Sequence, residues 1–236
     1  MIQLNDFRFR RVTPYVTRFT VSTLLGLLLS APLAQGQQAS IGQVTQAIEL
    51  HYNRLATLSI DFSQTMSFGG ASRPAQTGTV LLYRPSRMRW DYSEPKGQVL
   101  VGDGQRLYQY NPHTNQVRTV LLDESLDMRA PLAFLLGRLD FSRQFRNLRF
   151  ETIDGKRALV GEGRTGREAY TTVEFYFEPA QDYRLSALRA HGQDESVTDF
   201  IFSNERTNPR LDEKLFTFEA PAGAEILPET ALSDNL

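Results

Sequence analysis

Apolar and polar residues alternate along residues 77–122, and this alternation is the strongest structural signal in the chain. Within residues 87–92 every second residue is apolar and the residues between are charged. Because strand side chains point to opposite faces in turn, the pattern predicts a sheet with one apolar and one polar face. Turn residues at 102–104 and 111–115 divide the segment into about four or five short strands. We expect the apolar face to carry Met88, Trp90, Tyr108 and Tyr110.

Helical spacing occurs in two other places. Ser40 can cap a helix over residues 41–58, because apolar residues there recur every three or four positions, namely Val44, Ile48, Leu55 and Leu58 around Tyr52. The apolar segment 130–137 predicts a short helix, with Pro131 in its first turn and Gly137 at its end. One more helical turn is expected near residues 141–145.

The remaining strands are predicted from short alternating segments between turn residues. They cover residues 58–68, 148–153, 158–163, 170–177, 183–191, 198–204 and 215–219, and residues 69–78 are expected to form a loop. The pattern predicts a mainly β protein (α+β) with about ten or eleven antiparallel strands, which is enough to curl into an unclosed barrel. Helices of the expected size would cover part of its concave face as a lid.

Residues 1–36 have the pattern of a secretory signal peptide. Four arginines precede an apolar stretch, and small residues (Ala34 and Gly36) mark a cleavage site. Without this segment the formal charge changes from −1 to −4. The chain has no cysteine, which excludes disulfides and a lipid-modified N-terminal cysteine. We therefore expect a soluble, exported protein with one domain over residues 37–236.

The composition argues against several classes of function. A mildly acidic chain lacks the clustered Lys and Arg that neutralise nucleic-acid phosphates or anionic lipids. The three histidines His51, His113 and His191 are not at metal-ligand spacing, and we expect surface or capping roles for them. No hydrolase, phosphate-loop or dinucleotide motif is present. The sequence therefore favours a protein that is not an enzyme and uses no metal or cofactor.

Two residues each allow two interpretations. Arg84 precedes Pro85 and by alternation shares a face with Val80 and Leu82. It is either an ordinary arginine in a turn or a donor to helix-end carbonyls on a covering element, because a buried charge needs partners. Trp90 is either a core residue or part of a cavity wall. Composition does not separate these alternatives.

An ordered set of motifs resembles the outer-membrane lipoprotein carrier protein (LolA) family over residues 41–227. The central motifs are Arg84-Pro85, Arg89-Trp90, Pro95, Gly102-Asp103-Gly104, Tyr110-Asn111-Pro112 and Gln116-Val117. Flanking motifs are Asp61-Phe62-Ser63-Gln64, the segment 131–136, Gly192-Gln193, Asn208, Leu211, Leu215-Phe216, Phe218, and Pro221 with Gly223. His191 departs from the family, in which an acidic residue is common at this position.

The resemblance implies a periplasmic chaperone that shelters the acyl chains of lipoproteins inside a half-barrel. Its expected partners are acylated lipoproteins, an inner-membrane ABC transporter that releases them, and an outer-membrane receptor where one exists; a monomer without nucleic acid is expected. Arg84 matches the arginine that latches the lid in this family. The resemblance and the alternation together predict a hydrophobic cavity lined by Phe62, Leu82, Met88, Trp90, Tyr92, Leu132, Phe134 and Leu135.

Two other functions remain open at this point. A periplasmic lipid-sensing or regulatory domain of the same half-barrel fold would bind a lipid and report it to a protein partner. An enzyme with an unrecognised site is the third class.

Overall fold

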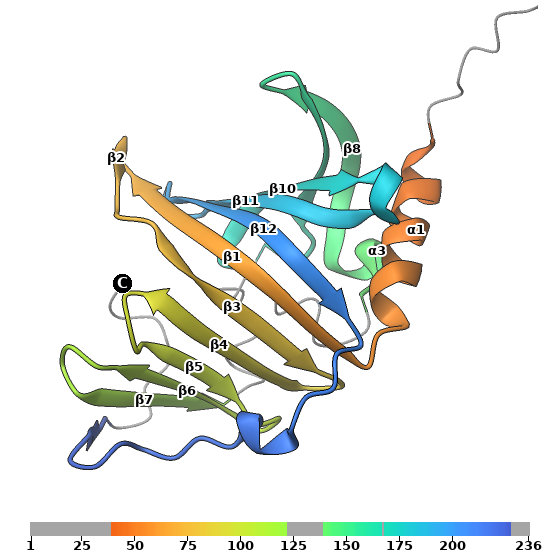
Figure 1. Ribbon diagram of the computed structural model, residues 1–236. Coiled ribbons are helices and arrows are strands. Elements are labelled where there is room, and N and C mark those ends of the chain that lie inside the picture. The colour runs from red at the N-terminus through yellow and green to blue at the C-terminus, as the bar shows by residue number, and fades with distance from the viewer. Residues whose placement is uncertain (1–38, 122–138, 167, 228–236) are drawn as a thin grey trace, which may run out of the picture. The chain divides into compact units, whose positions relative to one another are not determined.

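The computed structural model describes residues 39–121, 139–166 and 168–227 (Figure 1). Its helices are α1 (Ile41–Asn53) and α3 (Phe141–Gln144), with the 3-10 turns η2 (Pro179–Gln181) and η3 (Glu213–Phe216). Its strands are β1 (Thr57–Phe68), β2 (Ala71–Ser72), β3 (Gln76–Tyr83), β4 (Arg87–Glu94), β5 (Val99–Gly102), β6 (Arg106–Asn111), β7 (Gln116–Leu121), β8 (Phe145–Ile153), β9 (Lys156–Gly163), β10 (Tyr170–Glu178), β11 (Arg184–Gly192), β12 (Val197–Thr207) and β13 (Glu225–Ile226). The predicted short helix at 130–137 lies outside the described residues.

All the described strands belong to one 13-stranded sheet with the order β13-β7-β6-β5-β4-β3-β1-β12-β11-β10-β9-β8, and β2 pairs with β1. β1 lies in the middle of this order and pairs with β3 on one side and with β12 on the other. Within the described residues β8 and β13 are the end strands, so the sheet is open. The mainly β class and the unclosed sheet predicted from the sequence are confirmed.

Three details of the prediction were wrong. The sheet has two additional strands of two residues each, β2 inside the expected loop and β13, which runs parallel to β7. Residues 215–219 do not form a strand: Asp212 caps η3, and the ring of Phe216 packs against that of Tyr83 at 5.5 Å instead of joining a ladder. Helix α1 ends at Asn53, five residues early.

The early end of α1 has a clear physical cause. A capping box between Ser40 and Gln43 begins the helix, and Val44, Ile48 and Tyr52 are buried along one side of it. Leu58, expected on the same helix, is instead paired with Leu82 of β3 in the sheet. The segment 55–58 is too short for its apolar residues to distinguish a helix from a strand, and the hydrogen bonds of the sheet decide in favour of the strand.

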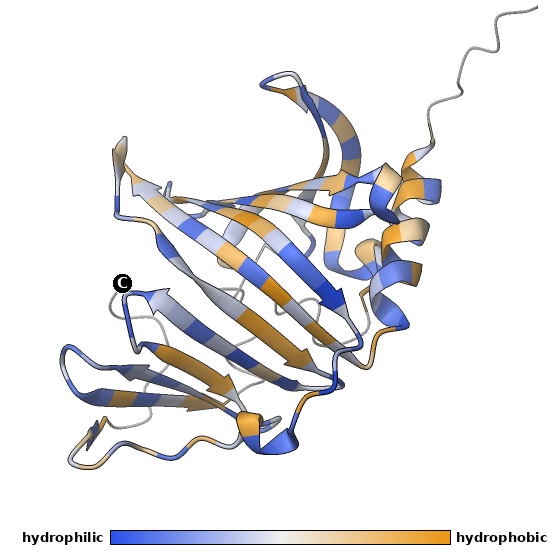
Figure 2. Cartoon of the chain, viewed as in Figure 1, coloured by the Kyte–Doolittle hydropathy of each residue, from blue (hydrophilic) through white to orange (hydrophobic). Residues whose placement is uncertain are grey.

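The two faces of the sheet differ in polarity, and Figure 2 shows the alternation along the central strands. Met88 and Trp90 are buried on the face that we call the inner face, while Arg89 and Asp91 form an ion pair on the opposite, outer face. The strand alternation predicted for residues 87–92 is therefore confirmed.

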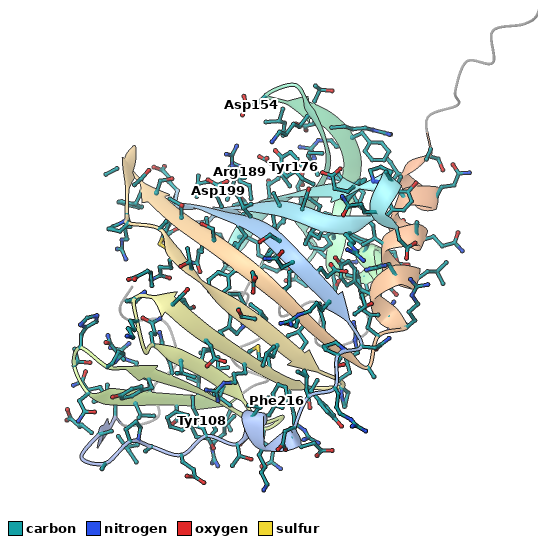
Figure 3. The ribbon with its side chains drawn as sticks, in the orientation of Figure 1. Tyr108, Asp154, Tyr176, Arg189, Asp199 and Phe216 are labelled. Carbon is teal, nitrogen blue, oxygen red and sulfur yellow. The ribbon has the colours of Figure 1, made fainter. Side chains whose placement is uncertain are left out.

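Tyr108 and Tyr110 lie on the outer face, so their predicted place beside Trp90 was wrong. Tyr108 pairs with Val101, which pairs with Arg89, and directly opposed residues share a face. The ring of Tyr108 stacks on that of Phe218 at 5.1 Å; Figure 3 shows Tyr108 near η3. Alternation fixes the faces within one strand, but it does not fix which face continues after a turn.

Candidate functional site

Four aromatic side chains meet on the inner face, and we call them the Trp90 cluster: Phe62, Trp90, Tyr92 and Phe200. The ring of Phe62 lies 4.9 Å from that of Trp90 and 5.3 Å from that of Tyr92, both edge to face. The ring of Phe200 lies 6.1 Å from that of Trp90. Burial raises the pKa of Tyr92 to about 12. The cluster is formed by three strands, β1, β4 and β12.

A glycine allows two of these rings to meet. Gly78 on β3 is paired with Phe62 on one side and with Tyr92 on the other. A Cβ at this position would collide with the backbone of Asp91 and Tyr92. Glycine within a strand marks such a close approach, and here it leaves the space over which the two rings make contact.

The structure places five of the eight predicted cavity residues together on the inner face. Leu82 and Met88 are directly paired and each is 2% exposed, next to Phe62, Trp90 and Tyr92. The other three, Leu132, Phe134 and Leu135, lie outside the described residues. Sequence reasoning missed Phe200 and Gly78; the alternation of Phe200 and Phe202 within 198–204 could have indicated the former.

A second group of aromatic side chains lies on the same face, and we call it the α3 cluster: Phe141, Phe145, Tyr170 and Phe175. Phe141, from helix α3, lies 5.2 Å from Phe175, Phe145 lies 5.2 Å from Phe175, and the rings of Phe141 and Phe145 are 5.8 Å apart, so the three rings contact one another. A row of paired residues, Phe175, Leu188 and Phe200, connects the two clusters across β10, β11 and β12.

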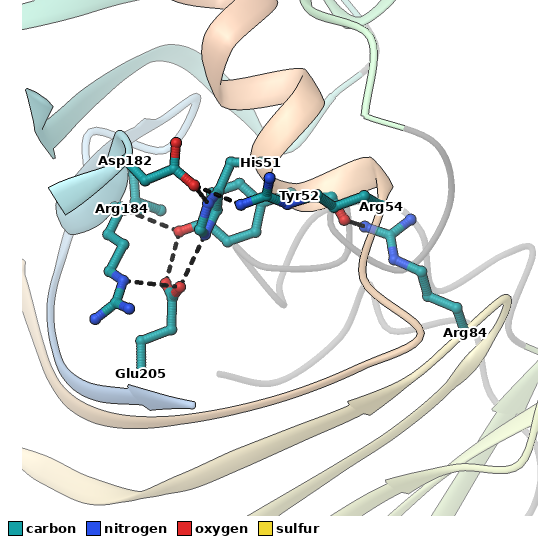
Figure 4. A network of polar contacts seen from close by, with 8 residues as sticks. His51, Tyr52, Arg54, Arg84, Asp182, Arg184 and Glu205 are labelled. Carbon is teal, nitrogen blue, oxygen red and sulfur yellow. Dashed lines mark hydrogen bonds and ion pairs between the residues drawn. The ribbon is translucent and has the colours of Figure 1, made fainter. Parts of the chain in front are cut away.

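Arg84 contacts the last turn of α1. Its Nη2 donates to the carbonyl oxygen of Tyr52 at 3.0 Å (Figure 4). Its backbone N–H donates to the carbonyl oxygen of Ala56 at 3.0 Å. Partial burial lowers the pKa of the guanidinium. Carbonyls at a helix C-terminus lack partners within the helix and carry partial negative charge, so they suit a cation. A half-buried arginine in the turn after β3 thus holds the end of α1.

The side chains of the same helical turn enter a polar network (Figure 4). His51 contacts Asp182 through Nδ1 at 3.0 Å and Glu205 through Nε2 at 2.9 Å. The Tyr52 hydroxyl donates to Glu205 at 2.9 Å and accepts from the backbone N–H of Leu185 at 2.8 Å. The hydrogen bond to Glu205 is the main cause that raises the pKa of His51, and the bond to His51 is the main cause that lowers the pKa of Asp182.

This network fills a place where two strands separate. The pairing of β11 with β12 runs from Ala187 with Ile201 to His191 with Val197. Beyond it, Leu185 bonds to the Tyr52 hydroxyl instead of the next strand. A cavity of about 450 Å³ lies there, with Ile60, Leu185, Phe202, Arg184 and Glu205 among its lining residues. The C-terminal turn of α1 therefore takes the place of strand pairing.

Helix α1 also holds the chain just after residue 138. The Asn53 side chain exchanges two hydrogen bonds with the backbone of Leu139, each 2.8 Å long. Glu49 accepts from the backbone N–H of Phe141 at 2.8 Å. This arrangement positions α3 and its cluster against α1.

The expected surface or capping role for histidines was wrong for His51, which is 3% exposed. The residues near His51 in the sequence could not reveal its role, because its partners Asp182 and Glu205 are more than 100 residues away. His191 bonds to Glu174 at 2.7 Å, and His113 is exposed in a turn.

Among the described residues no group of His, Cys, Asp or Glu could hold a metal ion. In the same part of the chain, no helix is long and apolar enough to span a membrane.

Taken together, the fold and the site define an open β half-barrel whose buried face carries aromatic rings and a helix held by Arg84. The sequence profile of the family described as outer membrane lipoprotein carrier protein LolA matches residues 53–219. This match covers more than half of the chain, and the protein belongs to the LolA family.

Individual relatives are similar over most of their length. A protein named outer-membrane lipoprotein carrier protein in Bordetella avium is 28% identical over 218 residues, which cover 90% of this chain and 99% of that protein. A protein of the same name in Nitrosospira multiformis is 29% identical over 175 residues, which cover 73% of this chain and 83% of that protein. A crystal structure of a LolA superfamily protein from Nitrosomonas europaea is 13% identical, covers 76% of this chain and 98% of that one, and has a TM-score of 0.45.

Proposed function

We propose that this protein is a periplasmic chaperone that shelters the acyl chains of lipoproteins and carries them to the outer membrane. Membership of a family of lipoprotein carriers supports the proposal. The single structural observation that carries it is the Trp90 cluster on the buried face of an open sheet. The proposed activity is binding and transfer, without a chemical reaction.

The physical need for such a carrier follows from the hydrophobic effect. Removing one methylene group from water is worth about 0.8 kcal/mol, so one long acyl chain requires roughly 10 kcal/mol of shelter. Aromatic rings and Met88 provide an apolar surface that adapts to flexible chains. An inner-membrane ABC transporter would supply the lipoprotein, and an outer-membrane receptor, where one exists, would accept it.

The contact between Arg84 and α1 supports a latch that opens and closes this binding site. A carrier must also release its cargo, so its closed empty state has to compete with the loaded state. One guanidinium bonded to a helix-end carbonyl is a contact that can break and re-form. Closing the latch on an empty site would then favour release.

The function is tested with spheroplasts that hold a newly made, outer-membrane-directed lipoprotein. After incubation with the purified protein, the supernatant is assayed for a one-to-one complex. We expect the lipoprotein to leave the membrane in that complex. Retention of the lipoprotein, together with binding of a fatty-acyl probe, would instead favour a lipid-sensing role. Retention without probe binding would contradict both.

The latch is tested with Arg84→Leu and with Arg210→Leu as the matched control, because Arg210 is exposed in the segment that follows β12. We expect Arg84→Leu to accept lipoprotein from spheroplasts but to pass it to outer-membrane vesicles slowly, whereas the control behaves as the unchanged protein. Efficient transfer by Arg84→Leu would remove this residue from the mechanism.

A further inference from the structure

Trp90 buries a polar atom that has no hydrogen-bond partner. The side chain is 2% exposed, and its Nε1 has no hydrogen-bond partner among the residues that the structure describes. The N–H of a buried tryptophan normally finds a partner, and a buried donor without one calls for an explanation. A phenylalanine would provide a similar apolar surface without this penalty.

The neighbours of the indole show why no acceptor is available. The rings of Phe62 and Phe200, at 4.9 and 6.1 Å, have no acceptor atoms. The ring of Tyr92, at 6.4 Å, carries a hydroxyl, but that oxygen does not accept a hydrogen bond from Nε1. The residues paired with Trp90 on β3 and β5 are Val80 and Leu100, both apolar. The described neighbours thus leave this donor unpaired, and a molecule that enters the cluster could supply the acceptor.

We propose that the indole N–H of Trp90 donates a hydrogen bond to the neutral carbonyl oxygen at the head of an acyl chain, in an ester or an amide. This inference rests on the proposed function and adds a specificity-determining residue to it. A plain hydrocarbon would leave the N–H unpaired. An ionised carboxylate would be a buried charge among apolar rings, which is unfavourable. An ester or amide carbonyl supplies one acceptor and no charge, so Trp90 selects acyl chains linked to a larger molecule.

Trp90 is the only tryptophan of the chain, so its indole N–H gives a single side-chain signal in a proton–nitrogen correlation spectrum. The isotope-labelled protein is titrated with methyl palmitate and, separately, with hexadecane, which has the same chain length. We expect the indole proton to move downfield with the ester and to move little with the hydrocarbon. Ester binding without the downfield movement would overturn the proposal. If neither ligand binds, the proposed function fails. If both ligands bind, the proposed function stands, and the movement of the indole proton alone decides the role of Trp90.

A near-isosteric variant provides the matched control. Benzothienylalanine in place of Trp90 keeps the shape of the indole and replaces its N–H with sulfur. We expect the affinity for methyl palmitate to fall by about three- to tenfold, as for loss of one hydrogen bond, while hexadecane binds equally well. Equal losses for both ligands would show a packing role and overturn the proposal. Palmitate that binds as tightly as the ester would overturn the preference for a neutral carbonyl. Should the variant not fold, the spectra of the unchanged protein decide.

Discussion

The two aromatic clusters of the inner face have similar composition but different surroundings. In the α3 cluster a helix contributes Phe141, whose ring contacts those of Phe145 and Phe175. In the Trp90 cluster all four rings come from strands, and within the described part of the chain the indole N–H of Trp90 has no acceptor. Both clusters belong to one continuous buried core. We propose that the α3 cluster, which a helix completes, is structural and that the Trp90 cluster, with its unmet donor, takes a ligand. Aromatic content alone does not distinguish these roles.

The largest expected effect is on stability, in the α3 cluster. Phe175 is 0% exposed and contacts rings from α3 and β8. We expect Phe175→Ala to lower the free energy of unfolding by about 3–5 kcal/mol, because the ring leaves a cavity that its neighbours cannot fill. Urea denaturation measures the loss. Affinity of the folded variant for an acyl probe should stay unchanged, and a large loss of affinity would contradict the division between the clusters.

The matched change in the Trp90 cluster should have the reverse profile. We expect Phe62→Ala to cost less than about 3 kcal/mol of stability, because the ring would line a ligand site rather than a closed core. The affinity for the acyl probe should fall by about tenfold or more, as for loss of one large apolar contact. Phe175→Ala, measured in the same assays, is the control. If both variants lost stability alone, the Trp90 cluster would be core as well.

A smaller effect is expected where α1, which positions the α3 cluster, enters the sheet. Tyr52→Phe removes a hydroxyl that pairs with Glu205 and with the backbone N–H of Leu185. Leaving buried groups unpaired should lower the free energy of unfolding by about 1–3 kcal/mol. The control is Tyr110→Phe, whose hydroxyl bonds to Asn115 in a half-exposed turn. Equal losses in the two variants would mean that the buried position of the hydroxyl does not matter.

The sequence predicted the parts of this comparison that depend on local pattern. The inward positions of Met88 and Trp90 follow from strand alternation, and the start of α1 follows from its capping residue Ser40. Arg84 was singled out by its position after an alternating strand, which left two interpretations open, and the structure brings its guanidinium to a helix-end carbonyl, as one of the two had it. Its role in cargo release stays a prediction.

Features that depend on distant residues could not be predicted. The partners of His51 lie more than 100 residues away, on either side of the gap between β11 and β12. The part played by Gly78 depends on the residues that it faces on two neighbouring strands, which no local pattern gives. The face occupied by Tyr108 was wrong for a related reason, since the register across a turn decides it.

The last and smallest effect concerns how pH acts on the attachment of α1. The pKa of His51 is raised, chiefly by its hydrogen bond to Glu205, while Arg184 also lies near Glu205 and Arg54 pairs with Asp182. A histidine with a raised pKa contributes stability that is complete below its ordinary value of 6.5 and is lost as pH rises through the raised value. The pKa of Asp182 is lowered, so its contribution is present above its ordinary value and disappears only as pH falls through the lowered one.

Between these two limits the network should hold α1 most firmly, and on the alkaline side of the raised His51 pKa the free energy of unfolding should decline. Urea denaturation from about pH 5 to about pH 9 measures this decline. We expect His51→Gln to remove it, because glutamine keeps hydrogen-bonding groups but does not titrate. His113→Gln should retain it, since His113 is exposed in a turn. A decline of the same size in His51→Gln would show that groups other than His51 set the pH dependence of stability.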